Sequence, residues 1–242
     1  MKSATPPSLL YRLVKTGGRN RTGRISSYHR GGGRARFYRL VELSPRSLGF
    51  ILKIVRDPAR KVPLFLVGYD NGYLCLHLAT FGLRETDFVG SLPFFLARPG
   101  FSFSLNRFPV GSSIHSITPT GLVTSAGSYS SVVRQLPTAT ALRLPSGEIR
   151  LFPSTYTATY GALSERRARF QRFLKAGSAR LIGRRPVVRG VAMNPVDHPH
   201  GGGQGKTSGG RPSSSPWGVY TKGYKTRPVR KPSSYILKKR SS

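Results

Sequence analysis

The positive charge of this chain is concentrated at its two ends, and this distribution restricts what the chain can fold into. Residues 1 to 60 carry 14 basic and 2 acidic residues (net +12), residues 61 to 150 carry 7 and 4 (net +3), and residues 151 to 242 carry 19 and 2 (net +17). Unopposed charge of this size destabilises a compact chain unless a polyanion neutralises it. The ends therefore favour polyanion binding, whereas the middle has the charge balance of an ordinary globular domain.

The C-terminal part is also rich in residues that oppose packing. From Gly183 to Pro232 there are 10 Gly and 7 Pro in 50 residues, which exceeds the level of about 25–30% at which packed structure becomes rare. Few large apolar side chains are present to offset the entropy of ordering this segment, so phosphate contacts would have to supply that free energy. We expect the tail to be disordered without a polyanion.

Several other classes of protein are disfavoured. The single cysteine, Cys75, excludes an internal disulfide framework and a Cys-based zinc or iron–sulfur site, and it favours a reducing compartment. No run approaches the roughly 20 apolar residues of a membrane span, and no secretory signal is visible. The first 41 residues lack acidic residues, which is typical of organelle transit segments, but a basic RNA-binding arm has the same composition and is favoured.

The middle of the chain carries strand signals. Asp70-Asn71-Gly72 separates two apolar runs and predicts a tight hairpin. One amphipathic helix is expected from Ala162 to Ala176, with Gly177 as its C-cap. Many short strands between Gly and Pro turns indicate small β-barrels. The expected strands span residues 37–41, 49–55, 64–69, 73–78, 113–117, 129–136, 140–144 and 148–152.

The segment from His200 to Thr207 nearly matches a nucleotide-binding phosphate loop. His200 occupies the position of the first Gly, and residues 208–212 cannot open a helix, so a nucleotide hydrolase is disfavoured. A glycine run that brings backbone amides close to fixed phosphates needs neither a strand nor a helix.

Asp197, His198 and His200 also allow a catalytic or a metal-binding interpretation. Catalysis would need a second carboxylate or a nucleophile, and the tail holds no other acidic residue. A metal would need a further ligand, and His29 and His115 are the histidines expected outside core strands. His77 alternates with apolar neighbours and is interpreted as a core histidine. A local turn that contacts RNA is favoured.

Two N-terminal stretches, residues 17–24 and 28–36, interleave Gly with Arg. Arg outnumbers Lys by 29 to 11 in the chain, and guanidinium groups pair bidentately with phosphate and stack on bases. Extended arms that thread between RNA helices are favoured over a solvated disordered tail. DNA is disfavoured because the sequence shows no Cys/His finger, basic zipper or helix-turn-helix pattern.

These motifs resemble the universal ribosomal large-subunit protein L two family. The most specific stretch runs from Arg189 to Gly203 (RGVAMNPVDHPHGGG), followed by Pro216-Trp217-Gly218 and Thr221-Lys222-Gly223. Further matches are residues 17–20 with 23–25, His29 with residues 31–33, 109–112 with His115, 125–127 with Tyr129, and 142–148. The chain departs from the family at Arg34-Ala35 and through the stretch from Leu43 to Phe103, and its N-terminal segment is shorter.

The resemblance implies a mainly β fold, with an OB-like barrel followed by an SH3-like barrel and basic terminal arms. The expected division is residues 1–33 (N-terminal rRNA-binding arm), 34–104 (OB-like barrel), 105–178 (SH3-like barrel with a basic helix) and 179–242 (Gly/Pro-rich rRNA-binding tail). No catalytic or metal-ligating residue is expected. The rRNA-binding residues expected from the motifs and the basic runs are Arg19, Asn20, Arg21, Arg24, His29, Arg30, Gly31, Gly32, Gly33, Arg34, Arg184, Arg185, Arg189, Asn194, Asp197, His198, His200, Gly201, Gly202, Gly203, Lys206, Trp217, Lys222, Lys225 and Arg227.

The resemblance also implies the partners. Large-subunit rRNA, neighbouring ribosomal proteins and the small subunit at the intersubunit face are expected, without a membrane, a homo-oligomer or a cofactor other than rRNA-associated magnesium. The expected role is structural, in assembly, in the peptidyl-transferase region and in subunit association. His29-Arg30-Gly31 favours the ribosome of the mitochondrial matrix over a bacterial or plastid one. The alternatives are an RNA-modifying or hydrolytic enzyme that uses Asp197 and His198, and a regulatory RNA-binding module outside a particle.

Overall fold

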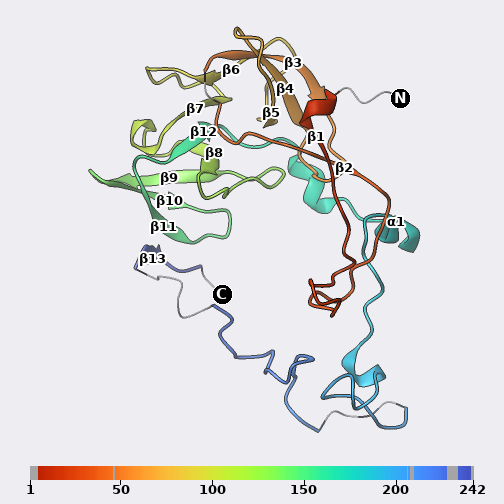
Figure 1. The fold of residues 1–242 in the computed structure, drawn as a ribbon. Coiled ribbons are helices and arrows are strands. Elements are labelled where there is room, and N and C mark those ends of the chain that lie inside the picture. Colours follow the sequence, from red (N-terminus) through yellow and green to blue (C-terminus); the bar gives the residue numbers. More distant parts are fainter. Residues whose placement is uncertain (1–4, 46, 206, 208–209, 228–233, 241–242) are drawn as a thin grey trace. The chain divides into compact units, whose positions relative to one another are not determined.

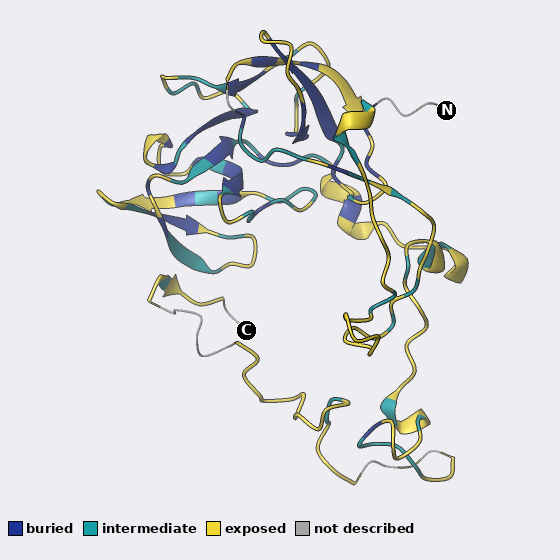
Figure 2. Cartoon of the chain, viewed as in Figure 1, coloured by how far each residue is buried: buried dark blue, intermediate teal, exposed yellow. Residues whose placement is uncertain are grey.

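A computed structural model describes residues 5–45, 47–205, 207, 210–227 and 234–240 (Figure 1). The chain separates into two compact units. The barrel unit comprises Met1–Val14, Ala35–Arg172 and Ser233–Ser242, and the arm unit comprises Lys15–Arg34 and Phe173–Pro232. Figure 2 shows buried residues concentrated in the barrel unit and mostly exposed residues in the arm unit. The four-segment division expected from the sequence stays a prediction.

The described elements are mainly strands, which confirms the mainly β fold class, with an OB-like and an SH3-like barrel. The strands are β1 (Leu10–Arg12), β2 (Phe37–Arg39), β3 (Gly49–Val55), β4 (Leu64–Tyr69), β5 (Leu74–Leu78), β6 (Phe88–Ser91), β7 (Phe101–Ser104), β8 (Ser113–Thr118), β9 (Ser130–Gln135), β10 (Ala139–Arg143), β11 (Ile149–Pro153), β12 (Thr157–Tyr160) and β13 (Ile236–Lys238). The helical elements are the 3₁₀ turns η1 (Pro7–Leu9), η2 (Leu105–Arg107), η3 (Arg166–Phe170) and η4 (Gly190–Ala192), and the short α-helix α1 (Ala176–Leu181).

Eleven strands form one sheet in the order β13-β11-β10-β9-β8-β12-β7-β6-β3-β4-β5, and β1 pairs with β2 separately. Neighbours in the sheet are antiparallel except β6 and β7, which are parallel. The expected hairpin is confirmed: β4 pairs with β5 from Leu64 opposite Leu78 to Gly68 opposite Leu74, and Gly72 takes φ +77° in the turn. A side chain with a Cβ rarely adopts that backbone angle.

Apolar side chains gather on each barrel's inner face. The first barrel, which contains β3 to β6, buries two clusters, one around Ile51, Phe65 and Val67 and one around Leu64, Leu76 and Leu163. The second barrel, which contains β7 to β12, buries a larger cluster that includes Phe101, Phe103, Phe108, Ile114 and Leu142. Burial of this apolar surface provides the main free energy of folding of the barrel unit. Figure 1 shows β3–β6 at one end of this unit and β9–β11 at the other.

His115, which the sequence analysis placed outside the core strands, is buried in the core within the strand predicted at residues 113–117. His115 lies in β8 with 1% of its surface exposed, and burial lowers its pKa to about 3. Its Nε2 lies 3.0 Å from the Thr80 hydroxyl and its Nδ1 lies 2.9 Å from the Ser116 hydroxyl. The polar residues that alternate with apolar ones in this strand suggested that His115 lies outside the core. The hydroxyl groups of Thr80 and Ser116 instead satisfy both ring nitrogens, which makes burial of the ring possible.

The amphipathic helix expected from Ala162 to Ala176 is wrong. Residues 162–164 are held by the barrel: the Phe81 amide donates to the Ala162 carbonyl at 2.8 Å, and the Ser164 amide donates to the Ala79 carbonyl at 2.9 Å. Glu165 then takes a left-handed conformation, with φ 61°. Between residues 162 and 181 only η3 and α1 are helical, and Gly177 lies inside α1 rather than at a C-cap. Tertiary hydrogen bonds thus override the helical period of the sequence.

The described helices are all short, and none has the length and apolar character that crossing a membrane requires.

Candidate nucleic-acid interface

The structure brings the two predicted rRNA-binding ends into a single unit. Every residue assigned to rRNA binding from the sequence lies in the two segments of the arm unit, although Lys206 falls outside the described residues. These segments contain 18 Lys or Arg and a single acidic residue, Asp197. The excess of basic over acidic residues is therefore large in the unit that holds the motifs assigned to rRNA binding.

Asn20 shapes the N-terminal loop. Its side-chain oxygen accepts hydrogen bonds from the backbone amides of Thr22 and Arg24, both at 3.0 Å, and from the Thr22 hydroxyl at 2.7 Å. Such an Asx turn replaces backbone hydrogen bonds that an open loop would lack. Asn20 thus fixes the loop, and the exposed Arg19, Arg21 and Arg24 project from it.

Gly33, the last residue of the N-terminal glycine triplet, is required by the protein's own backbone. The Gly31 amide donates to the Gly183 carbonyl at 2.8 Å, and the Arg34 amide donates to the Leu181 carbonyl at 2.9 Å. A Cβ at Gly33 would lie 2.7 Å from the Gly183 nitrogen. The Arg185 amide closes the pairing by donating to the His29 carbonyl at 3.0 Å. The triplet joins two arm segments, a role that the sequence analysis did not assign to it.

The second glycine triplet wraps around the Asn194-Pro195 turn. A Cβ at Gly201 would overlap the Asn194 carbonyl oxygen, and the Gly202 amide donates to the Met193 carbonyl at 3.0 Å. Gly203 lies against the Thr207 side chain and has φ +90°. In this triplet, too, the absence of a Cβ lets the backbone pack against the chain's own residues.

His198 and His200 serve this turn as well. His198 is buried, and its Nδ1 accepts a hydrogen bond from the His200 amide at 3.0 Å. The Nε2 of His200 accepts from the Ser214 amide at 2.9 Å, and the two rings stack with centroids 5.3 Å apart. Nitrogens that accept backbone hydrogen bonds hold the loop in shape and lack the lone pair that a metal would need.

The cationic residues assigned from the sequence are exposed. This group consists of Arg19, Arg21, Arg24, Arg30, Arg34, Arg184, Arg185, Arg189, Lys222, Lys225 and Arg227. Asn194 and Asp197 are exposed too. Exposed guanidinium and ammonium groups on a scaffold of tight backbone turns can bind phosphates along a strand.

A cleft of about 470 Å³ lies inside the arm unit. It is lined by residues 26–29, by Asp197 and His198, and by Trp217, among others. Tyr28 and Trp217 meet edge to face, with ring centroids 5.7 Å apart. Trp217 was predicted from the sequence and Tyr28 was not, although Tyr28 stands beside His29 in an Arg/Gly stretch.

The barrel unit holds a basic cleft that the charge counts of the three sequence segments did not reveal, because its cations come from all three. A space of about 670 Å³ is lined by Arg60, Lys61 and Arg169, and a second of about 600 Å³ shares Arg169 and adds Arg143 and Arg166. The Arg60 guanidinium lies over the Tyr38 ring at 4.4 Å from its centroid. Residues scattered along the sequence are thus gathered by the fold into a surface that suits phosphates.

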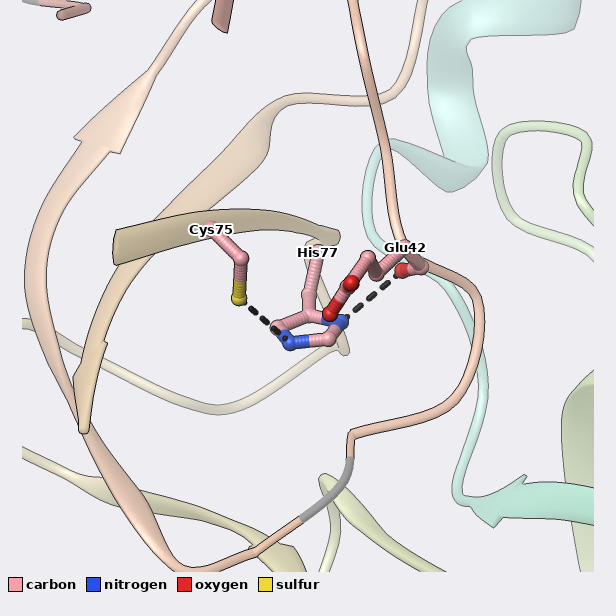
Figure 3. A group of neighbouring side chains, drawn as sticks. All are labelled: Glu42, Cys75 and His77. Atoms are coloured by element: carbon pink, nitrogen blue, oxygen red, sulfur yellow. Dashed lines mark hydrogen bonds between the residues drawn. The ribbon is translucent and has the colours of Figure 1, made fainter. Parts of the chain in front are cut away.

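Among the described residues, Glu42, Cys75 and His77 form a group with metal-ligating side chains, shown in Figure 3. The Glu42 carbonyl can only accept, so the His77 Nδ1 donates to it, at 2.8 Å. The Nε2 is then an acceptor, 2.9 Å from both the Tyr69 hydroxyl and the Cys75 Sγ. Burial lowers the pKa of His77, while the Glu42 carbonyl and carboxylate oppose this shift. These bonds satisfy the ring and confirm His77 as a core histidine.

Comparison with known proteins agrees with this geometry. The family model described as "Ribosomal Proteins L2, RNA binding N-terminal domain" matches residues 7–91, and the model described as "Ribosomal Proteins L2, C-terminal domain" matches residues 98–218. The chain belongs to the ribosomal protein L2 family. It is 42% identical to a protein named large ribosomal subunit protein uL2 from Shewanella denitrificans, over 97% of this chain and 88% of that protein. The identity with the protein of that name from Shewanella baltica is also 42%, over 96% and 88%.

These L2 relatives contradict the mitochondrial localisation expected from the sequence. They are bacterial proteins, which indicates a bacterial ribosome rather than a mitochondrial one. The expectation rested on three residues, His29-Arg30-Gly31, whereas the similarity to the bacterial relatives extends over almost the whole chain. A short motif within an Arg/Gly-rich arm is weak evidence, because such residues recur wherever an arm binds phosphate.

Proposed function

We propose that this chain is a structural constituent of the large ribosomal subunit and binds large-subunit rRNA through its arm unit. The observation that carries the proposal is that the family motifs assigned to rRNA binding all lie in a unit that holds 18 basic residues and one acidic residue. Phosphate neutralisation with release of counterions supplies the affinity. Base-edge and shape contacts then fix the position on the RNA.

The proposal includes the partners that the family resemblance implies. The loop from Asn194 to Gly203 approaches the peptidyl-transferase region, and the chain contributes to assembly, contacts neighbouring ribosomal proteins and meets the small subunit. It acts as a monomer, and the magnesium near it belongs to the rRNA. The support is the match to the L2 family over most of the chain.

We also propose that the chain catalyses no reaction of its own. The enzyme alternative required Asp197 and His198 to act as an acid/base pair. The His198 Nδ1 instead accepts the His200 amide, and the ring packs against Gly190. Both observations favour a role in loop architecture. Turnover of RNA by the free full-length chain, abolished in His198→Gln, would support the enzyme alternative instead.

Sedimentation tests the proposed function directly. A tagged full-length chain is produced in bacterial cells, and the lysate is resolved on a sucrose gradient at magnesium concentrations that keep the subunits apart. We expect nearly all of the chain in the large-subunit peak. A chain found mostly at the top of the gradient, or with small RNAs outside the particle, contradicts the proposal and favours a regulatory RNA-binding module.

Replacement of arginines in either unit tests whether the arm unit is the part that binds rRNA. Arg21, Arg24 and Arg189 are exposed in the arm unit, and Arg84, Arg98 and Arg134 are exposed in the barrel unit. Replacing the first three by Gln should reduce incorporation in competition with the unmodified chain. The same replacement of the second three is the matched control with equal loss of charge, and it should compete normally.

A further inference from the structure

The cleft in the arm unit has the size and the walls of a ligand site. Its volume, about 470 Å³, lies within the roughly 300–1,000 Å³ of small-molecule sites. Tyr28 is 45% exposed and Trp217 is 68% exposed. The two rings meet edge to face with their planes inclined by 63°, so the edge of one ring covers part of one face of the other and the remaining ring faces stay exposed. Large aromatic faces left open to water are available for a flat ligand to stack on.

The same cleft contains a carboxylate, which is not expected in a surface that binds only phosphate because both groups are negatively charged. Asp197 lines the cleft and is the one acidic residue among the 18 cations of the arm unit. Its backbone amide donates to the Asn194 carbonyl at 3.0 Å, which fixes the turn that carries it. An ionised carboxylate repels phosphate and accepts hydrogen bonds only. Among the groups that an RNA offers, those that fit this carboxylate are therefore the ones that present hydrogen-bond donors.

Aromatic faces and a carboxylate together match a nucleobase better than a sugar or a phosphate. Stacking on Trp217 or Tyr28 suits the face of any base, so the carboxylate decides which base edge fits. Guanine presents two adjacent donors, N1–H and N2–H, to the two oxygens of Asp197. Adenine and cytosine place a ring-nitrogen acceptor beside their amino group, and uracil flanks its single donor with two carbonyls, so each of them sets an acceptor against the carboxylate.

We propose that this cleft receives one unpaired guanine of the bound RNA. The base stacks against the aromatic wall of Tyr28 and Trp217, and its N1–H and N2–H donate to the Asp197 carboxylate. This inference rests on the proposed function, because it identifies a base-specific contact within the interface that the cations create. The surrounding Arg and Lys side chains hold the flanking phosphates while the carboxylate reads the base.

The test uses kethoxal, a dicarbonyl reagent that modifies N1 and N2 of unpaired guanine, on large-subunit rRNA bound by the full-length chain. We expect one guanine to be protected by the unmodified chain and to become reactive with Asp197→Asn and with Trp217→Ala. The matched aromatic control is Tyr220→Ala, because Tyr220 is 58% exposed in the same hairpin and lies outside the cleft. It should leave the protection intact.

Conservative variants separate recognition from misfolding. Trp217→Phe keeps an aromatic face and should retain the protection, and Asp197→Glu keeps the carboxylate and should restore part of it. Trp217→Ala should weaken binding by about 5- to 150-fold, the range for loss of one stacked base. Asp197→Asn removes a negative charge, so phosphate attraction alone would make it bind as tightly or more tightly while the guanine stays protected.

Filter binding of the same complexes distinguishes failure of the proposed rRNA binding from failure of the guanine site. If the unmodified chain does not bind large-subunit rRNA, the proposed function fails. If it binds but every guanine reacts equally in the unmodified, Asp197→Asn and Trp217→Ala complexes, the guanine site fails and the proposed function stands. Protection of an adenine, a cytosine or a uracil that depends on Asp197 also overturns the guanine assignment.

Discussion

The amide of Gly31 donates a hydrogen bond to the carbonyl oxygen of Gly183 at 2.8 Å. This bond joins an N-terminal basic segment to a C-terminal one that lies far away in the sequence. The pairing continues through Arg34 with Leu181 and through His29 with Arg185. The two basic segments, residues 15–34 and 173–232, therefore present their cations from one unit rather than as independent tails.

Substitution of Gly33 tests this pairing. Gly33 has φ +57°, and a Cβ there would lie 2.7 Å from the Gly183 nitrogen and 2.8 Å from the Leu181 oxygen. We expect Gly33→Ala to destabilise the pairing by about 1–3 kcal/mol, the usual cost of a left-handed non-glycine residue. The measurement is hydrogen exchange of the Gly31 and Arg34 amides, which should lose protection. Gly32→Ala is the control, because nothing lies within 4 Å of a Cβ there. Equal exchange in both variants would show that Gly33 is not needed for the pairing.

The sequence predicted the fold where local patterns decide it. Asn71-Gly72 located the β4–β5 hairpin, and the strands from β8 to β11 lie within one or two residues of their predicted bounds. β1, β6, β7, β12 and β13 were missed. β6 and β7 pair in parallel, and β13 joins β11 from the far end of the chain. Such pairings depend on distant partners, which a local pattern does not reveal.

The residue types of the candidate site could be predicted from the sequence, whereas their arrangement in space could not. Charge and motifs located the arms, whereas the roles of Asn20 and of Gly33 in the protein's own turns follow from hydrogen bonds and close contacts that a sequence does not display. The cleft beside Trp217 needs Tyr28 from the other arm segment. Its existence depends on the pairing of the two segments.

The buried carboxylate of Asp57 should contribute strongly to the free energy of unfolding of the first barrel. The Asp57 side chain is fully buried and lies 2.7 Å from the Arg60 guanidinium and 3.4 Å from that of the buried Arg39. Asp57→Asn leaves both guanidinium groups without a counter-charge, and removal of one partner of a buried pair costs about 3–5 kcal/mol. Urea unfolding followed by circular dichroism checks this. The exposed Asp70→Asn is the control, expected within about 0.5 kcal/mol of the unmodified chain. Similar losses in both variants would argue against the ion pairs.

His115 should make the barrel unit sensitive to acid. Burial lowers its pKa from 6.5 to about 3, so the folded chain holds the neutral ring and the unfolded chain takes up a proton. The stabilisation is complete above pH 6.5 and is lost as the pH falls toward 3, by about 1.4 kcal/mol per pH unit and about 2 kcal/mol at pH 5. His77, whose pKa is also lowered by burial, acts in the same direction.

Unfolding free energies of the full-length chain between pH 7 and pH 4 test this dependence. His115→Gln removes the titrating ring, so its stability should change less steeply with pH than that of the unmodified chain. Identical slopes for the two proteins would show that folding does not change the pKa of His115.

Trp217 provides an intrinsic reporter for the cleft, because it is the only tryptophan of the chain. Stacking of a guanine on the indole should quench its emission when large-subunit rRNA binds. The quenching should be reduced in Asp197→Asn under conditions in which both proteins are saturated with RNA. Equal quenching in both proteins would show that the indole responds to RNA without the carboxylate contact.

The salt dependence of rRNA binding tests the central claim most directly. The logarithm of the binding constant of the full-length chain is measured against the logarithm of the salt concentration, together with the Arg21, Arg24 and Arg189 to Gln variant and the Arg84, Arg98 and Arg134 to Gln variant. Each lost phosphate contact lowers the slope by about 0.7–0.9. The arm variant should therefore lose about 2–3 units of slope while the barrel variant keeps the original value. A slope that is shallow from the start, or that falls equally in both variants, would contradict the assignment of rRNA binding to the arm unit.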